Sequence, residues 1–154
     1  MSKKLWIALV VAMVAAVAGL QPGKQQTSVT HSSSVQHSGV AHDNISELTA
    51  ERRVVGYLQQ HQRLPDYYIT KSQARRQGWD AREGNLCNTL PGRAIGGDRF
   101  ANREGRLPQQ QGRKWFEADV NYRCGHRNAD RLLYSSDGLI FLTKDHYRSF
   151  NKVN

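Results

Sequence analysis

The sequence has 154 residues, of which 38% are hydrophobic, and its 22 Lys and Arg residues outnumber 13 Asp and Glu residues, for a formal charge of +9 at pH 7. This length allows one domain of ordinary size and excludes two large ones. Part of the apolar content lies in one N-terminal block, so the folded part must have a small core. The basic balance indicates a polyanionic partner, either nucleic acid or an anionic membrane surface.

Residues 1–20 have the pattern of a secretory signal peptide. Two lysines at positions 3 and 4 precede an apolar run from Leu5 to Leu20, and Ala16-Val17-Ala18 fits a cleavage site for small residues. A membrane-spanning helix usually needs about 20 apolar residues. We therefore expect cleavage near Ala18 rather than an uncleaved anchor, and a secreted protein, either extracellular or periplasmic, without stable membrane association.

Residues 21–44 are rich in Ser, Gln and His, and residues 21–42 contain no Phe, Trp, Tyr, Asp or Glu. This composition cannot build a core and predicts a disordered linker or pro-segment. His31, His37 and His42 could suggest metal binding, but their loose spacing favours solvated polar residues instead. The folded domain is expected to span residues 45–154, and it contains all of the arginines.

The first half of this domain carries helix signals. Apolar residues at roughly helical spacing predict a helix over 48–62, which Leu64-Pro65 ends. Thr70 and Gln73 form a capping-box pattern, and Gly78 can end a helix in the left-handed conformation, so a second helix is expected over 71–77. A short helix or turn is expected over 85–90, before Pro91-Gly92.

The second half carries strand signals, at 94–99, 114–120, 131–135, 139–143 and 149–152. Asp137-Gly138 predicts a tight hairpin between the third and the fourth of these, since both residues tolerate positive φ. Helices followed by such strands predict an α+β fold, with N-terminal helices packed on a C-terminal antiparallel β-sheet.

Cys87 and Cys124 are the only cysteines in the sequence. An even number of cysteines behind an export signal favours a disulfide between them. A zinc site that uses His126 is the alternative, but it lacks a fourth ligand.

No motif for acyl transfer, nucleotide hydrolysis or zinc proteolysis occurs in the sequence. The remaining candidates are carboxylates and histidines that could act in general acid/base catalysis. Strand alternation places Trp115, Glu117 and Asp119 on one face. A carboxylate such as Glu117 is usually a solvent-facing residue, and it would become a catalytic candidate if Arg127, Arg131 and His146 converged on it.

Seven segments in fixed order resemble one family, the barnase-like, guanyl-specific microbial ribonucleases, almost without gaps from about residue 45 to 154. They are Leu64-Pro65-Asp66, Tyr68-Ile69-Thr70-Lys71-Ser72, Ile95-Gly96-Gly97-Asp98, Asn102-Arg103-Glu104-Gly105, Glu117-Ala118-Asp119, Leu133-Tyr134-Ser135-Ser136-Asp137 and Asp145-His146-Tyr147.

The resemblance implies a secreted endoribonuclease with the microbial ribonuclease fold, which needs no metal or cofactor. It implies that Glu117 is the general base and His146 the general acid, with Lys71, Arg127 and Arg131 as cations around the phosphate. The product would be a 2′,3′-cyclic phosphate that is then hydrolysed to a 3′-phosphate. Asp119 would orient the two arginines without acting on the substrate.

The resemblance also implies that the loop Phe100-Ala101-Asn102-Arg103-Glu104 reads guanine, with Glu104 accepting from N1–H and N2–H of the base and Phe100 and Tyr147 providing ring faces. Without the family match, Asn-Arg-Glu-Gly is more simply a turn. A family member has serine at the position of Ala101, a difference that a loop acting through main-chain amides should tolerate.

A small acidic inhibitor resembling barstar, which would cover Lys71, Arg103 and His146, is an expected partner besides RNA, and we expect the enzyme to be a monomer. Two other classes stay open: a basic binding module that kept the fold and lost activity, and a toxin delivered to competitors.

Overall fold

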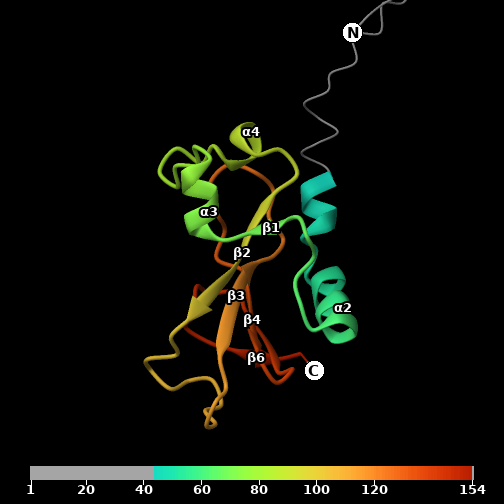
Figure 1. The fold of residues 1–154 in the computed structure, drawn as a ribbon, viewed down its shortest axis with the longest axis vertical. Helices are drawn as coiled ribbons and strands as arrows, with labels where there is room; N and C mark the ends of the chain where they lie inside the picture. Colours follow the sequence, from blue (N-terminus) through green and yellow to red (C-terminus); the bar gives the residue numbers. More distant parts are fainter. Residues whose placement is uncertain (1–43, 154) are drawn as a thin grey trace, which may run out of the picture. The chain divides into compact units, whose positions relative to one another are not determined.

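The computed structural model describes residues 44–153, so the predicted signal peptide, nearly all of the predicted linker and its three histidines lie outside the described residues. The described part contains helices followed by strands, which confirms the α+β fold class (Figure 1). After a helical segment at 44–48 the elements are α2 (Glu51–His61), β1 (Tyr68–Ile69), α3 (Lys71–Arg76), α4 (Leu86–Thr89), β2 (Ala94–Phe100), β3 (Trp115–Asp119), β4 (Arg131–Ser135), β5 (Ile140–Thr143) and β6 (Asn151–Lys152).

The strands of the described residues form one six-stranded sheet in the order β1-β2-β3-β4-β5-β6. Every neighbouring pair is antiparallel except β1 and β2, which are parallel, with Tyr68 opposite Ala94. Strand β1 is not predictable from the sequence pattern, because two residues are too few for a periodic signal. The Tyr68 hydroxyl donates to the Asp119 carbonyl (2.7 Å), which ties this short strand to β3.

The first predicted helix begins later than expected, at Glu51 rather than at residue 48. The interruption lies at Thr49, whose carbonyl accepts from the Asn121 amide (2.8 Å) and whose buried hydroxyl accepts from the Tyr122 amide (3.0 Å). At the other end, Gln62 caps α2 in the left-handed conformation. A tertiary contact therefore fixes the start of this helix.

Helix α3 forms where the capping box and Gly78 predict a helix. Thr70 and Gln73 form both bonds of the capping box, and Gly78 has a φ of +97° just beyond the helix. The Lys71 amide also donates to the Asp98 carboxylate of β2 (2.9 Å). This bond places the first residue of α3 beside the sheet and so positions the Lys71 side chain.

The two faces of β3 serve different purposes. Ala118 and Val120 point into the main core, which includes Val54 and Leu58 of α2. Trp115, on the other face, belongs to a second small cluster with Leu107 and Leu133. Glu117 and Asp119 share that second face with Trp115 and are also buried, at 5% and 2% exposure. Two carboxylates are therefore buried on the face of the sheet that does not pack against α2.

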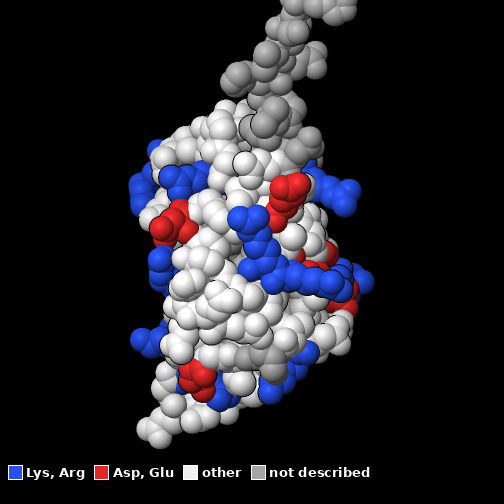
Figure 2. All heavy atoms as spheres, turned by 90° about the vertical axis from the view of Figure 1, so that its right-hand side faces the viewer, with Lys and Arg blue, Asp and Glu red and all other residues white. Residues whose placement is uncertain are grey.

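A disulfide joins Cys87 of α4 to Cys124, with a Cα–Cα distance of 5.6 Å, which confirms the predicted pairing. The turn at Asp137-Gly138 joins β4 to β5 as expected, with Gly138 at a φ of +94°. Within residues 44–153, no helix is both long and apolar enough to cross a membrane. On the face seen in Figure 2, Lys and Arg side chains are interspersed with Asp and Glu rather than gathered in one patch.

Candidate active site

Glu117 lies at the centre of a small polar cluster on the second face of the sheet. The Lys71 ammonium donates a hydrogen bond to Glu117 Oε1, and the Tyr147 hydroxyl donates to Oε2 (2.6 Å). Lys71 begins α3, Glu117 lies mid-strand in β3 and Tyr147 follows β5. The solvent-facing alternative for Glu117 is therefore wrong, because both of its oxygens are engaged and the residue is buried.

These contacts set the protonation state of Glu117. Burial alone would raise the pKa of its carboxyl, but the hydrogen bonds from Lys71 and Tyr147 and the charges of Lys71 and Arg127 outweigh it, so the pKa is lowered. At neutral pH the side chain is an ionised carboxylate, which can accept a proton. Conversely, burial and the bond to Glu117 raise the pKa of the Tyr147 phenol, which stays a hydrogen-bond donor.

Asp119, two residues further along β3, holds two arginines. Arg127 donates from Nε and Nη2 to both carboxylate oxygens of Asp119, each at 2.6 Å. Arg131 places its Nε 2.9 Å from Asp119 Oδ1, and its Nη1 donates to the Asp130 carbonyl (2.7 Å). The Arg131 Nε lacks a well-aligned hydrogen bond, so its contact with Asp119 is mainly an ion pair. Asp119 thus fixes both guanidinium groups beside Glu117.

The pKa of Arg127 shows the effect of this pairing. Burial alone would lower it, but the hydrogen bonds and the charge of Asp119 raise it above the usual value. The guanidinium therefore remains charged although it is partly buried.

His146 lies on a constrained turn after β5. His146 and Tyr147 both have left-handed backbones, with φ of 55° and 71°, which non-glycine residues seldom adopt. Asp145 supports the turn by accepting hydrogen bonds from the amides of Arg148 (3.0 Å) and Ser149 (2.9 Å). The exposed His146 ring stands 4.9 Å from the Tyr147 ring, centroid to centroid, so it lies next to the residue that contacts Glu117.

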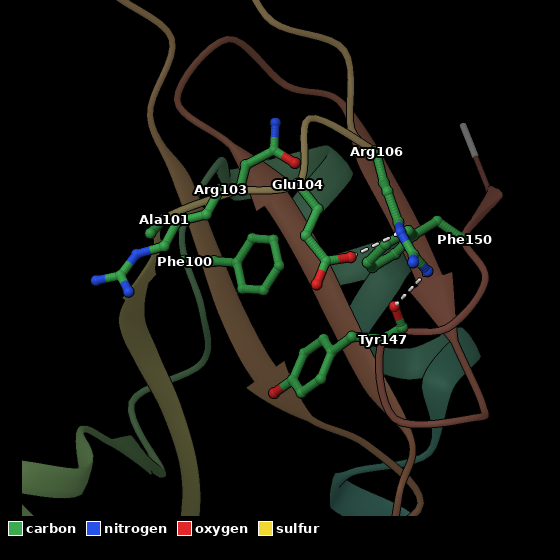
Figure 3. Close-up of a pocket in the computed structure, with 8 residues that line it drawn as sticks. Phe100, Ala101, Arg103, Glu104, Arg106, Tyr147 and Phe150 are labelled. Atoms are coloured by element: carbon green, nitrogen blue, oxygen red, sulfur yellow. Dashed lines mark hydrogen bonds and ion pairs between the residues drawn. The ribbon is translucent and has the colours of Figure 1, made fainter.

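A cavity of about 270 Å³ adjoins this cluster. Its lining residues are Phe100, Ala101, Asn102, Arg103, Glu104, Arg106, Tyr147 and Phe150 (Figure 3). The rings of Phe100 and Tyr147 are stacked, with centroids 5.4 Å apart and planes at 19°. Tyr147 therefore belongs to both the cavity and the polar cluster, and it joins them.

The Asn102 side chain is hydrogen-bonded within its own loop. Its amide donates to the Leu107 carbonyl (2.9 Å) and accepts from the Leu107 amide (3.0 Å), while its own backbone has a φ of 46°. These bonds close the loop between β2 and β3 on itself. The side chain of Asn102 therefore shapes the loop through its two bonds to Leu107.

Glu104 and Arg103 point in different directions. In Figure 3 the Glu104 carboxylate extends into the cavity between Phe100 and Arg106, whereas the Arg103 guanidinium points away from the rings. Glu104 Oε2 lies 2.8 Å from Arg106 Nε. Arg106 and Phe150 were absent from the sequence-based site. A cation two residues after Glu104 was the available signal for Arg106, whereas Phe150 carried none.

The structure thus brings together two groups of predicted residues. The first group is the polar cluster of Lys71, Glu117, Asp119, Arg127, Arg131 and Tyr147, with His146 at its border. The second group lines the cavity and consists of Phe100, Asn102, Arg103 and Glu104. Over residues 44–153, no cluster of three or more His, Cys, Asp or Glu side chains could hold a metal ion. Cys87 and Cys124 belong to neither group.

Known proteins similar to this chain in sequence include several bacterial ribonucleases. A family model described as ribonuclease matches residues 51–154. The chain is 50% identical over 128 residues to a ribonuclease of Bacillus intermedius, covering 83% of this chain and 78% of that protein. It is 50% identical over 127 residues to a ribonuclease of Bacillus pumilus, covering 82% and 78%.

A third relative is shorter and more similar. It is a ribonuclease of Heyndrickxia coagulans, 60% identical over 100 residues, which cover 65% of this chain and 92% of that protein. The family model covers most of the chain, including every residue of the polar cluster. The chain belongs to the barnase-like family of bacterial ribonucleases.

Proposed function

We propose that this ribonuclease cleaves single-stranded RNA after guanosine by metal-independent transesterification. The observation that carries the proposal is the setting of Glu117, a buried, ionised carboxylate between Lys71 and Tyr147, two residues before the Asp119 that holds Arg127 and Arg131. Phosphoryl transfer within RNA needs a base, an acid and positive charge, and this cluster offers all three in one place.

In the first step Glu117 removes the proton of the ribose 2′-hydroxyl. The 2′-oxygen forms a bond to the adjacent phosphorus, and the bond from phosphorus to the 5′-oxygen breaks. His146 gives a proton to the departing 5′-oxygen. The products are a 2′,3′-cyclic phosphate and a free 5′-hydroxyl, so the numbers of atoms and protons balance. DNA has no 2′-hydroxyl and cannot take this route.

The cations stabilise the charge that accumulates on the phosphate oxygens during attack. Lys71 approaches from α3, while Arg127 and Arg131 approach from the side of Asp119. Because Asp119 already fixes both guanidinium groups, little reorganisation is needed when the transition state forms.

In the second step water opens the cyclic phosphate with the roles reversed. His146 accepts a proton from water, and Glu117, which gained a proton in the first step, returns it to the 2′-oxygen. The product is a 3′-phosphate. The same two side chains therefore complete the cycle in their original protonation states.

The cavity beside the cluster would hold the base on the 5′ side of the cleaved bond. A carboxylate accepts from adjacent N–H groups, and guanine presents N1–H and N2–H side by side, so Glu104 selects guanine. Phe100 and Tyr147 provide aromatic surface, and the main chain of the loop from Ala101 to Arg103 can donate to O6. Arg103 points away from the rings, where it can meet a phosphate or an acidic partner.

Two aspects of the biology also belong to this proposal. The pattern of residues 1–20 and the disulfide agree with secretion into an oxidising compartment. A cluster with several cations near an open surface is suited to a small acidic inhibitor, such as a protein resembling barstar, that would cover Lys71, Arg103 and His146. We propose that the enzyme acts as a monomer without stable membrane association.

One experiment tests the reaction, the metal independence and the base preference together. The purified, air-oxidised protein is incubated with single-stranded RNA in EDTA, and the 3′-terminal nucleotide and phosphate of the fragments are identified. We expect guanosine 2′,3′-cyclic phosphate termini first and 3′-phosphates later. Glu117→Ala protein, prepared in parallel, controls for a contaminating nuclease. Binding of RNA without cleavage, or cleavage abolished by EDTA, contradicts the proposal.

A further inference from the structure

Arg106 connects the two halves of the site through one guanidinium group. Its Nε lies 2.8 Å from Glu104 Oε2. Its Nη1 donates to the Arg148 carbonyl (2.6 Å) and approaches the Tyr147 carbonyl (3.4 Å). Figure 3 shows the Arg106 side chain at the edge of the cavity, between the Glu104 carboxylate and the Tyr147 segment. One side chain thus contacts both the base-reading carboxylate and the turn that carries His146.

The ion pair itself contributes little to the stability of the fold. The side chains of Arg106 and Glu104 are 48% and 72% exposed, and exposed pairs are screened by water and salt. An exposed glutamate without a partner samples many rotamers, and binding a ligand through it requires that freedom to be lost. Arg106 restricts Glu104 before any ligand arrives.

The contact leaves Glu104 able to bind a base. An ionised carboxylate has about four acceptor sites on its two oxygens, and Arg106 pairs with Glu104 through an ion pair between Nε and Oε2. Within residues 44–153, no group donates a hydrogen bond to Glu104 Oε1, and the contact with Arg106 is at Oε2. A pair of adjacent N–H groups on a base can therefore approach the carboxylate while Arg106 stays in place.

We propose that Arg106 is a positioning residue for base selection, which acts by holding Glu104 at the wall of the cavity. The inference rests on the proposed function, because it takes guanine as the base that Glu104 reads. The anchor for Arg106 is the backbone of Tyr147 and Arg148, so the position of Glu104 is defined relative to the same turn that presents Tyr147 and His146.

A double-mutant cycle tests whether Arg106 acts through Glu104. Arg106→Met, Glu104→Gln and the double variant are compared with the unchanged protein on guanosine and adenosine dinucleotides, and kcat and KM are measured for each. We expect Arg106→Met to lower the guanosine-to-adenosine ratio of kcat/KM about three- to fivefold, as an exposed ion pair would, mainly through a higher KM for guanosine. In the Glu104→Gln background the same change should leave the ratio unaltered.

Arg93→Met is the matched control. Arg93 also has an exposed guanidinium that donates to a backbone carbonyl, that of Asp66 (2.7 Å), and it lies at the opposite end of β2 from the cavity. We expect this variant to lose the same charge without a change in the ratio. Melting temperatures of all variants show whether the fold is kept.

The outcomes separate this inference from the proposed function. If Arg106→Met lowers kcat/KM equally for both dinucleotides, and does so again in the Glu104→Gln background, Arg106 only supports the turn and the inference is wrong. A ratio that rises in Arg106→Met, as expected if Arg106 competed with the base, also overturns it. If Glu104→Gln alone leaves the ratio unchanged, guanine reading by Glu104 is wrong as well.

Discussion

The Tyr147 hydroxyl donates a 2.6 Å hydrogen bond to Glu117 Oε2 across a separation of 30 residues. Tyr147 also stacks on Phe100 in the cavity and adjoins His146 in the chain. One residue therefore connects the cavity wall proposed to hold the nucleobase, the proposed general base Glu117 and the proposed general acid His146. The Lys71 ammonium engages the other oxygen of Glu117, so this carboxylate cannot rotate freely.

Tyr147→Phe should change the pH dependence of cleavage. The variant keeps the ring and removes one of the hydrogen bonds that lower the pKa of Glu117, while the burial that raises this pKa remains. The pKa should therefore rise, and the general base becomes protonated at a higher pH. We expect the acidic limb of the kcat/KM profile to move to higher pH. Tyr134→Phe is the control: it removes the hydroxyl of a tyrosine stacked on Phe116 and should not move the limb. An unmoved limb in Tyr147→Phe would show that the hydrogen bond does not tune the base.

His146→Ala should lower the rate of RNA cleavage by a factor of about 10² to 10⁴ with the fold intact, because general acid catalysis supplies that much. Glu117→Ala should lower it by a similar factor. Cleavage rates and melting temperatures check both expectations. His61→Ala, which removes an exposed histidine at the end of α2, should keep the full rate. A nearly normal rate in His146→Ala would rule out its assignment as the acid.

Glu104→Gln should impair cleavage after guanosine more than cleavage after adenosine. The substitution keeps the shape of the side chain but places an N–H donor against the N–H pair of guanine, which leaves polar groups unpaired. Initial rates on the two dinucleotides measure the effect. Equal losses on both would mean that the loop does not discriminate between the bases.

Asp137→Asn should lower the stability of the fold at neutral pH but not in acid, because it removes the ion pair with Arg113. Hydrogen bonds from Arg113 and Ser135 lower the pKa of Asp137 to about 2 from a usual 3.8. Because the folded-state pKa is the lower one, the carboxylate stabilises the fold above pH of about 4, and this contribution disappears as the pH falls towards 2. Urea unfolding of both proteins at several pH values should show a stability difference at pH 6 that shrinks below about pH 4. A difference independent of pH would exclude this linkage.

Removal of the disulfide should reduce stability and spare activity. Cys87 and Cys124 are 37 residues apart in the sequence, and closing a loop of that length contributes about 4 kcal/mol in the chain-entropy model. We expect the Cys87→Ser, Cys124→Ser double variant to melt at a lower temperature while cleaving RNA at a similar rate at 25 °C. Thermal unfolding and a rate assay measure both. An equal melting temperature, or a large loss of activity at 25 °C, would contradict the expectation.

Local sequence signals determined several elements of this fold. The capping box at Thr70 and Gln73 and the glycine at position 78 placed α3, and Asp137-Gly138 placed the β4–β5 turn, because each of these devices acts within a few residues of chain. The two cysteines predicted their own pairing, since no other partner exists in the sequence. Motifs in fixed order predicted the family and, with it, the residues of the site.

Only the tertiary structure decided how those residues are used. Strand alternation placed Glu117 and Asp119 on one face, but their burial depends on side chains from α3, the loop before β4 and the turn after β5. The delayed start of α2 depends on Tyr122, and β1 exists only by pairing with β2. The contact from Arg106 to the Tyr147–Arg148 backbone spans more than 40 residues. These features arise from packing between distant segments, which no local pattern in the sequence encodes.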